Sequence, residues 1–144
     1  MPMLNRAADL ATRKLPKVFS PRGHAIADYV TVGAFALLGS VFWRRHKRAA
    51  LASQICAGAE LATNLLTDYP GGITGVIPFN THRTIDMGLA AMCATMPEFL
   101  NFEGDQEKKL FLAQAAVITC VTNLTDFGRP PLAIAGGKVM QRAS

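Results

Sequence analysis

The chain contains two copies of one polar pattern, and the copies are 58 positions apart throughout. Each copy enters an apolar stretch through His-x-x-x-Asp and leaves a second apolar stretch through Leu-Thr-Asp. A constant step between sparse polar residues is typical of a duplicated unit. We therefore expect two equivalent halves, 20–69 and 78–127, within a single domain, 1–144. The repeated residues are His24, Asp28, Leu66, Thr67 and Asp68 in the first copy and His82, Asp86, Leu124, Thr125 and Asp126 in the second.

Four long apolar stretches fill most of the two halves. Charged residues make up 17% of the chain, below the roughly 25% usual for a soluble domain, and 29–43 and 110–125 contain none. A helix on the surface of a soluble bundle needs a polar face that recurs every turn, whereas roughly 20 apolar residues cross a bilayer as a helix. We therefore predict an all-α, four-helix transmembrane bundle made from a tandem duplicated helical hairpin. The predicted spans are 24–43, 49–68, 82–100 and 109–127.

The composition of these stretches leaves a second architecture open. They are rich in Ala, Gly, Ser and Thr, which let helix backbones approach closely inside a bilayer. Pro97 and Glu98 interrupt the third stretch near its end, a place where neighbours and water satisfy the freed carbonyl. The alternative is a soluble bundle whose apolar helices are buried in a larger assembly. We expect the lipid bilayer as the first partner, together with protein partners or a homo-oligomer.

Basic residues lie outside the predicted spans and give the chain a formal net charge of +5. Segment 3–19 places apolar residues on one face and Arg or Lys elsewhere, which predicts an amphipathic helix in the membrane interface. Ser20 and Pro21 predict the start of the first long helix, and 128–144 is expected to be a C-terminal arm that docks partners. The basic cluster 44–48 has no interleaved aromatic residues, which favours a membrane surface over nucleic acid.

The second half carries Asp86 at the start of an apolar helix and Met96-Pro-Glu-Phe-Leu-Asn-Phe102 at its exit. This order resembles the SPW-repeat group of small bacterial membrane proteins, in which an Asp is followed by Ser-Pro-Trp and a hydrophobic exit. The Ser and Trp of that motif are replaced here, and Gly39-Ser-Val41 stands at the matching place in the first half. The resemblance implies a multi-pass protein of the bacterial inner (cytoplasmic) membrane and implies no reaction.

The repeated polar residues are candidates for a shared site. His24 and Asp28 are one helical turn apart, so their side chains share a helix face, and the second copy repeats this spacing. An antiparallel hairpin returns the end of its second helix beside the start of its first, which brings the two Leu-Thr-Asp segments to the same region. We therefore expect one polar or ligand cluster near one membrane surface. Its members are His24, Asp28, Asp68, His82, Asp86 and Asp126.

Two interpretations of this cluster follow from its chemistry, beside a third in which it handles protons or small ions. In the first, the carboxylates cap neighbouring helix starts and accept hydrogen bonds from the imidazoles, which holds the two hairpins together. In the second, the cluster binds a divalent metal ion, because imidazole and carboxylate together suit several such ions. The candidate metal ligands are His24, Asp28, His82 and Asp86.

Glu60 breaks the symmetry between the halves. It follows Cys56 and precedes Asn64 at four-residue spacing, so Glu60 and Asn64 form a polar stripe within a predicted span that leads toward Asp68. The matching residue in the second half is Ile118. A carboxyl group at that depth is costly and is by default a functional candidate, which makes transport of a proton or small ion along the Glu60–Asp68 face a further alternative.

The chain lacks the motifs of common catalytic sites. Its glycines lack the Lys-Ser/Thr of a phosphate loop, and CxxC and HExxH are absent from the sequence. The three cysteines, Cys56, Cys93 and Cys120, are spread through apolar segments and are expected to be packing residues in a reducing compartment. We therefore predict a non-enzymatic structural or accessory subunit of a membrane complex. A metal- or cofactor-binding membrane protein is the alternative function.

Overall fold

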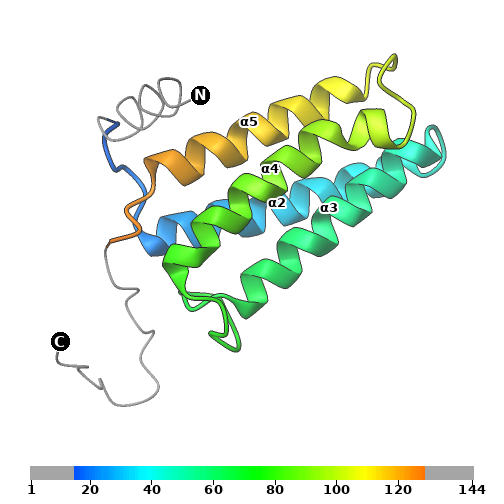
Figure 1. The fold of residues 1–144 in the computed structure, drawn as a ribbon. Coiled ribbons are helices and arrows are strands. Elements are labelled where there is room, and N and C mark those ends of the chain that lie inside the picture. The colour runs from blue at the N-terminus through cyan, green and yellow to red at the C-terminus, as the bar shows by residue number, and fades with distance from the viewer. Residues whose placement is uncertain (1–14, 129–144) are drawn as a thin grey trace, which may run out of the picture.

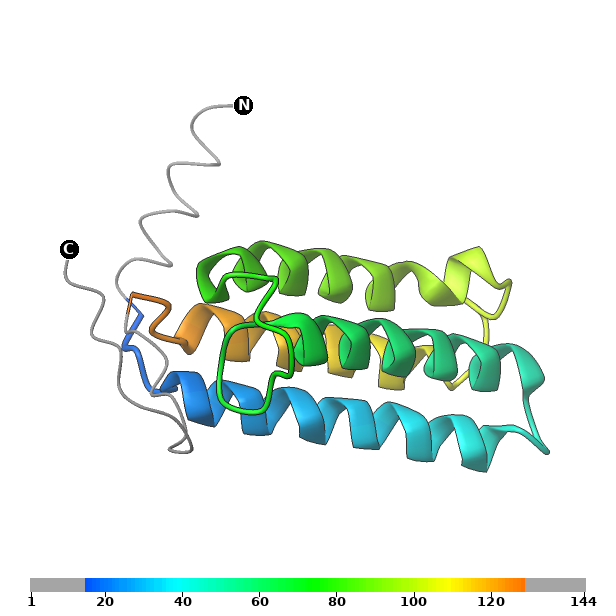
Figure 2. The ribbon, with the colours of Figure 1, turned by 90° about the horizontal axis from the view of Figure 1, so that it is seen from below.

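The protein, seen here in a computed structural model that describes residues 15–128, is an up-down-up-down bundle of four helices (Figure 1). Figure 2 shows the α2–α3 and α4–α5 turns at one end of the bundle, with the α3–α4 loop and the outer ends of α2 and α5 at the other. The prediction of an all-α, four-helix fold is confirmed. The helices are α2 (Pro21–Phe42), α3 (Lys47–Leu66), α4 (Phe79–Phe99) and α5 (Lys108–Leu124).

The order of the helices around the bundle decides which side chains can meet at its centre. Both α2 and α4 pack against α3 and against α5. They are therefore diagonal partners, and side chains of α2 and α4 that contact one another must do so on the bundle axis.

The two halves are linked by equivalent backbone pairs at the end of the bundle that holds the α3–α4 loop. Phe19, before α2, pairs with Thr125, after α5, and Ile77, before α4, pairs with Thr67, after α3. In both pairs the residue that follows the threonine donates its N–H to the partner carbonyl, at 3.0 and 2.8 Å. Because the two pairs are related by the 58-residue step, each half begins beside the end of the other.

The apolar core lies toward the opposite end of the bundle. The ring centroid of Phe111 lies 5.8 Å from that of Phe35 and 5.3 Å from that of Phe102. The Gln54 side chain of α3 lies over Gly39 of α2, in the space that a Cβ at this position would fill. Three alanines of α3, Ala49, Ala50 and Ala52, are fully buried.

Polar contacts fix the start of α2 and the far end of the bundle. The Ser20 side chain accepts a hydrogen bond from the Gly23 N–H at 3.2 Å, as expected for the first helix start. At the far end, His46 Nε2 lies 2.7 Å from Asp105 Oδ2, which joins the two hairpin turns.

The prediction of four membrane spans receives support from one helix. Within residues 15–128, α2 alone is long and apolar enough to cross a bilayer by length and composition. The physical reason is that α5 has only 17 residues and that strongly polar residues lower the mean hydropathy of α3 and α4. These are chiefly Gln54, Glu60 and Asn64 in α3 and Asn80, His82 and Arg83 in α4. Transmembrane character is thus not shown for the bundle, and these criteria do not support a multi-pass protein.

The flanking predictions fall largely on residues that the structure does not describe. Residues 3–14 of the expected interfacial helix and 129–144 of the expected C-terminal arm lie outside the described range. Residues 15–19 are not helical. The backbone N–H groups of Val18 and Phe19 instead donate to Leu124 O at 2.8 and 3.1 Å, because this segment closes the start of one half against the end of the other.

Candidate metal centre

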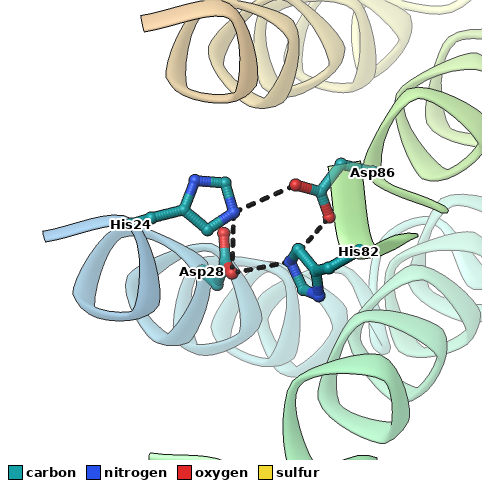
Figure 3. A group of neighbouring side chains, drawn as sticks. All are labelled: His24, Asp28, His82 and Asp86. Carbon is teal, nitrogen blue, oxygen red and sulfur yellow. Dashed lines mark hydrogen bonds and ion pairs between the residues drawn. The ribbon is translucent and has the colours of Figure 1, made fainter. Parts of the chain in front are cut away.

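Two imidazoles and two carboxylates meet on the bundle axis. Figure 3 shows His24 and Asp28 of α2 and His82 and Asp86 of α4 turned toward one another. Each residue offers one ligand atom, and the four atoms lie within 4.8 Å of one another. All four residues are at least 94% buried. The diagonal position of α2 and α4 therefore converts two one-turn motifs into one enclosed cluster.

The distances within the cluster are short and nearly equal. His24 Nε2 lies 3.3 Å from Asp28 Oδ2 and 3.0 Å from Asp86 Oδ2. His82 Nε2 lies 3.2 Å from Asp28 Oδ2 and 2.9 Å from Asp86 Oδ1. Each ring nitrogen thus faces both carboxylates, one from its own helix and one from the diagonal helix.

Two threonines fix the protonation of the outer ring nitrogens. The Thr67 hydroxyl donates to Thr63 O at 2.7 Å and lies 2.7 Å from His82 Nδ1. Because a hydroxyl has one proton, Thr67 must accept at His82, so the proton of that hydrogen bond is on Nδ1. Thr125 repeats this arrangement in the other half: it donates to a helix carbonyl at 2.6 Å and lies 2.8 Å from His24 Nδ1.

The inner nitrogens must therefore face the carboxylates either as imidazolium N–H groups or as lone pairs. A lone pair and a carboxylate oxygen at 2.9–3.3 Å repel one another unless a cation lies between them. Two ring protons or one divalent cation would each bring the charge of the cluster to zero.

Hydrogen-bond geometry is satisfied at only one of the four short nitrogen–oxygen separations. His82 Nε2 and Asp28 Oδ2 form a hydrogen bond, whereas the buried atoms His24 Nε2 and Asp86 Oδ1 make none. Metal bonds of about 2.0–2.1 Å at tetrahedral angles would hold neighbouring ligand atoms about 3.3 Å apart. The four nitrogen–oxygen separations are also those of ion pairs, and the four ligand atoms lie within 4.8 Å of one another, so the cluster accommodates either imidazolium protons or a bound cation.

A second layer of hydrogen bonds holds the carboxylates. The Tyr69 hydroxyl donates to Asp28 Oδ2 at 3.1 Å, and the Thr122 hydroxyl donates to Asp86 Oδ2 at 3.1 Å. Burial and the nearby Asp28 carboxylate raise the pKa of Tyr69, so its phenol stays a donor. Metal-binding imidazoles and carboxylates usually carry such outer partners, and here every one of the four residues has one.

Aromatic rings close the outer end of the cluster. The His24 ring centroid lies 5.7 Å from that of Phe79, 5.2 Å from that of Phe127 and 6.4 Å from that of Tyr69. The α3–α4 loop that carries Tyr69 is held by Tyr29, whose hydroxyl donates to Gly71 O at 2.6 Å. The cluster is therefore sealed within the protein.

The structure brings together four of the six residues predicted for the shared site. Asp68 is exposed and Asp126 is half-buried, and neither belongs to the four-residue group. Each of them directly follows the threonine that ends its helix. The Asp68 backbone N–H donates to Ile77 O, and the Asp126 backbone N–H donates to Phe19 O. The Asp126 side chain accepts from Gly128 N–H at 3.1 Å.

Sequence reasoning missed the role of the threonines. Thr67 and Thr125 belong to the repeated Leu-Thr-Asp segment, but the prediction selected the neighbouring aspartates instead. The signal was present, since the threonines keep the 58-residue step as strictly as the histidines do. Tyr69 carries no such signal, because its counterpart is Phe127, which has no hydroxyl.

The predicted polar stripe is buried as far as Asn64. Glu60 is 2% exposed and Asn64 is fully buried, with no hydrogen bond at either side-chain amide atom. In the second half the corresponding places hold Ile118 and Thr122. The second half therefore shows that this fold does not require a carboxyl group at the position of Glu60.

No protein-family model, curated protein or solved structure matches this chain. The resemblance to the SPW-repeat group stays a prediction, and the function must be inferred from the site itself.

The threonine contacts predict that the same Thr→Val change lowers the free energy of unfolding by different amounts at two positions. Thr67→Val keeps the side-chain shape but leaves the buried His82 Nδ1–H without an acceptor, which should lower the free energy of unfolding by about 1–3 kcal/mol. Thr95→Val is the control, because the exposed Thr95 hydroxyl donates only to carbonyls of its own helix; we expect a change within about 0.5 kcal/mol. Chemical denaturation followed by circular dichroism measures both values. Equal losses would contradict the assigned hydrogen bond.

Proposed function

We propose that this chain is a membrane-embedded bundle in which one divalent metal ion joins two duplicated hairpins. The ligands would be His24 and Asp28 of α2 and His82 and Asp86 of α4. The observation that carries the proposal is the convergence of four buried ligand atoms within 4.8 Å, from two helices that meet only across the bundle axis. The role is structural and non-enzymatic, as expected for an accessory subunit.

The ligand set favours a first-row transition ion, and zinc fits it best. Two imidazole nitrogens with two carboxylate oxygens suit zinc in a four-coordinate shell. Catalytic zinc sites keep one position open for water or substrate, whereas structural sites are closed. Here four protein ligands, the aromatic rings around His24 and the α3–α4 loop leave no approach for a substrate.

The metal proposal predicts one bound ion per chain. In protein purified without chelator, elemental analysis should find about one equivalent of zinc or a similar ion, and His82→Ala or Asp86→Asn should reduce it to background. Free ion at 1,000 times its Kd would stabilise the fold by about 4 kcal/mol, so a chelator should lower the unfolding temperature of the wild type. Asp86→Asn keeps the size of the side chain and guards against a variant that simply fails to fold.

His46→Ala provides the matched control. His46 is also a histidine beside a carboxylate, 2.7 Å from Asp105 Oδ2, but it precedes α3 in the α2–α3 turn, at the opposite end of the bundle. We expect this variant to keep its metal. A metal-free wild type whose unfolding temperature ignores added zinc would overturn the proposal and leave the cluster as a set of buried ion pairs.

The bilayer part of the proposal is based on the outer surface of the helices. Within 29–43, 49–67, 84–97 and 110–125 the only charged residues are Glu60 and Asp86, and both are buried. Apart from the exposed Gln54, the exposed side chains there are apolar or small, with Val30 at 65% and Leu37 at 66% exposure. The longest of these segments spans about 28 Å at about 1.5 Å per residue, close to the roughly 30 Å of a bilayer core. Exposure of such an apolar surface to water would be unfavourable for a soluble bundle.

Membrane insertion predicts a position-dependent effect of a new charge. Leu37→Lys puts a lysine in the middle of the uncharged belt, at a cost of up to about 2.5–3.5 kcal/mol, whereas Trp43→Lys puts one at the exposed end of α2. The wild type and Trp43→Lys should remain in the membrane pellet after an alkaline carbonate wash, and the yield of Leu37→Lys should fall several-fold. Recovery of the wild type as a monodisperse protein without detergent would refute insertion.

Glu60 favours a second candidate function, the movement of a proton or small cation through the bundle. The favouring observation is its burial at a position where the other half has Ile118. If Glu60 carries the ion, proteoliposomes should show flux that Glu60→Gln reduces at least ten-fold. Glu98→Gln, a change at an exposed carboxyl group near the end of α4, should leave flux unchanged. Equal flux in Glu60→Gln and wild type would remove this candidate.

A further inference from the structure

Two free thiols, one on α3 and one on α4, contact one another in the middle of the bundle. Cys56 and Cys93 are 1% and 2% exposed, their Sγ atoms lie 3.4 Å apart, and the Cys93 S–H donates to Cys56 Sγ. The third cysteine, Cys120, is exposed on α5. The pair connects the first half of the chain to the second, as the His/Asp cluster does.

The duplicated fold does not dictate cysteines at these positions. One step of 58 residues from Cys56 is Gln114, and one step back from Cys93 is Phe35. Gln114 Nε2 donates to Thr31 Oγ1 at 3.0 Å, while Phe35 fills the core. The same helix positions thus accept quite different side chains, so packing alone does not explain why two thiols meet.

The contact needs little movement to become covalent. A disulfide has an S–S distance of about 2.05 Å, so closure from 3.4 Å requires each sulfur to move by less than about 0.7 Å. The hydrogen bond from Cys93 favours negative charge on Cys56 Sγ, which makes Cys56 the attacking group, because the thiolate is the nucleophile.

We propose that Cys56 and Cys93 are a peroxide-sensitive pair that forms a disulfide between α3 and α4. Cys56 Sγ attacks one oxygen of hydrogen peroxide, the O–O bond breaks, and Cys56 becomes a sulfenic acid as one water leaves. Cys93 Sγ then attacks the Cys56 sulfur, the S–O bond breaks, and the departing hydroxyl leaves as a second water with the proton of the Cys93 thiol. Two thiols and one peroxide thus give one disulfide and two waters.

The consequence is a covalent link between the two halves of the bundle. It would close a loop between residues 56 and 93 and reduce the freedom of the unfolded chain. Oxidation should therefore raise the unfolding temperature by roughly 10 °C. This site is separate from the His/Asp cluster, so the disulfide proposal does not depend on the metal proposal.

The test is thiol counting by intact mass on the full chain in mild detergent. After treatment with hydrogen peroxide and then with N-ethylmaleimide in denaturant, wild type should carry one maleimide, at Cys120, and be 2 Da lighter than its reduced form before alkylation. Dithiothreitol should restore three reactive thiols. Digestion without reductant should yield a cross-linked peptide that contains Cys56 and Cys93.

Matched variants decide the assignment. Cys120→Ser should still form the disulfide, whereas Cys56→Ser and Cys93→Ser should not, and neither serine variant should show the rise in unfolding temperature. Circular dichroism before oxidation verifies that each variant is folded. Three alkylated thiols in peroxide-treated wild type, a gain of 32 Da from sulfinic acid, or a disulfide that requires Cys120 would each overturn the proposal.

Discussion

The structure depends on the neutralisation of two carboxylates that lie on the axis of the bundle. Asp28 and Asp86 are held by diagonal helices and face the inner nitrogens of His24 and His82. A buried charge without a partner is strongly unfavourable, so the two halves can pack only if protons or a cation balance the charge. The threonines that fix the outer nitrogens turn this requirement into a specific arrangement, because they leave the inner nitrogens to face the carboxylates.

Duplication explains why this arrangement is symmetric, and departures from duplication show where the chain has diverged. Each half supplies a histidine, a carboxylate and a threonine, and each threonine serves the histidine of the other half. Glu60 and the two contacting cysteines have no counterpart of the same type one step away. The second half acts as an internal comparison, since it shows which polar residues the fold itself requires.

The mean hydropathy of a helix and the polarity of its exposed face lead to different conclusions about membrane insertion. Within the described residues only α2 passes as a membrane helix by length and composition, because α5 is too short and polar residues lower the mean hydropathy of α3 and α4. Many of those polar residues are buried: α3 alone buries Ser53, Glu60, Thr63 and Asn64. An average over a helix counts inward and outward residues alike, whereas the solvent meets only the outward ones.

The sequence by itself determined the four helices, their antiparallel order within two equivalent halves and the repeated His-x-x-x-Asp pairs that meet in the central cluster. Periodicity and a constant 58-residue step are local properties that survive without coordinates. Only the tertiary structure decided that Asp68 and Asp126 stay outside the cluster, that Thr67 and Thr125 fix the histidines, and that Cys56 meets Cys93. These outcomes depend on which way each side chain points where two helices cross, and no pattern along one chain records that direction.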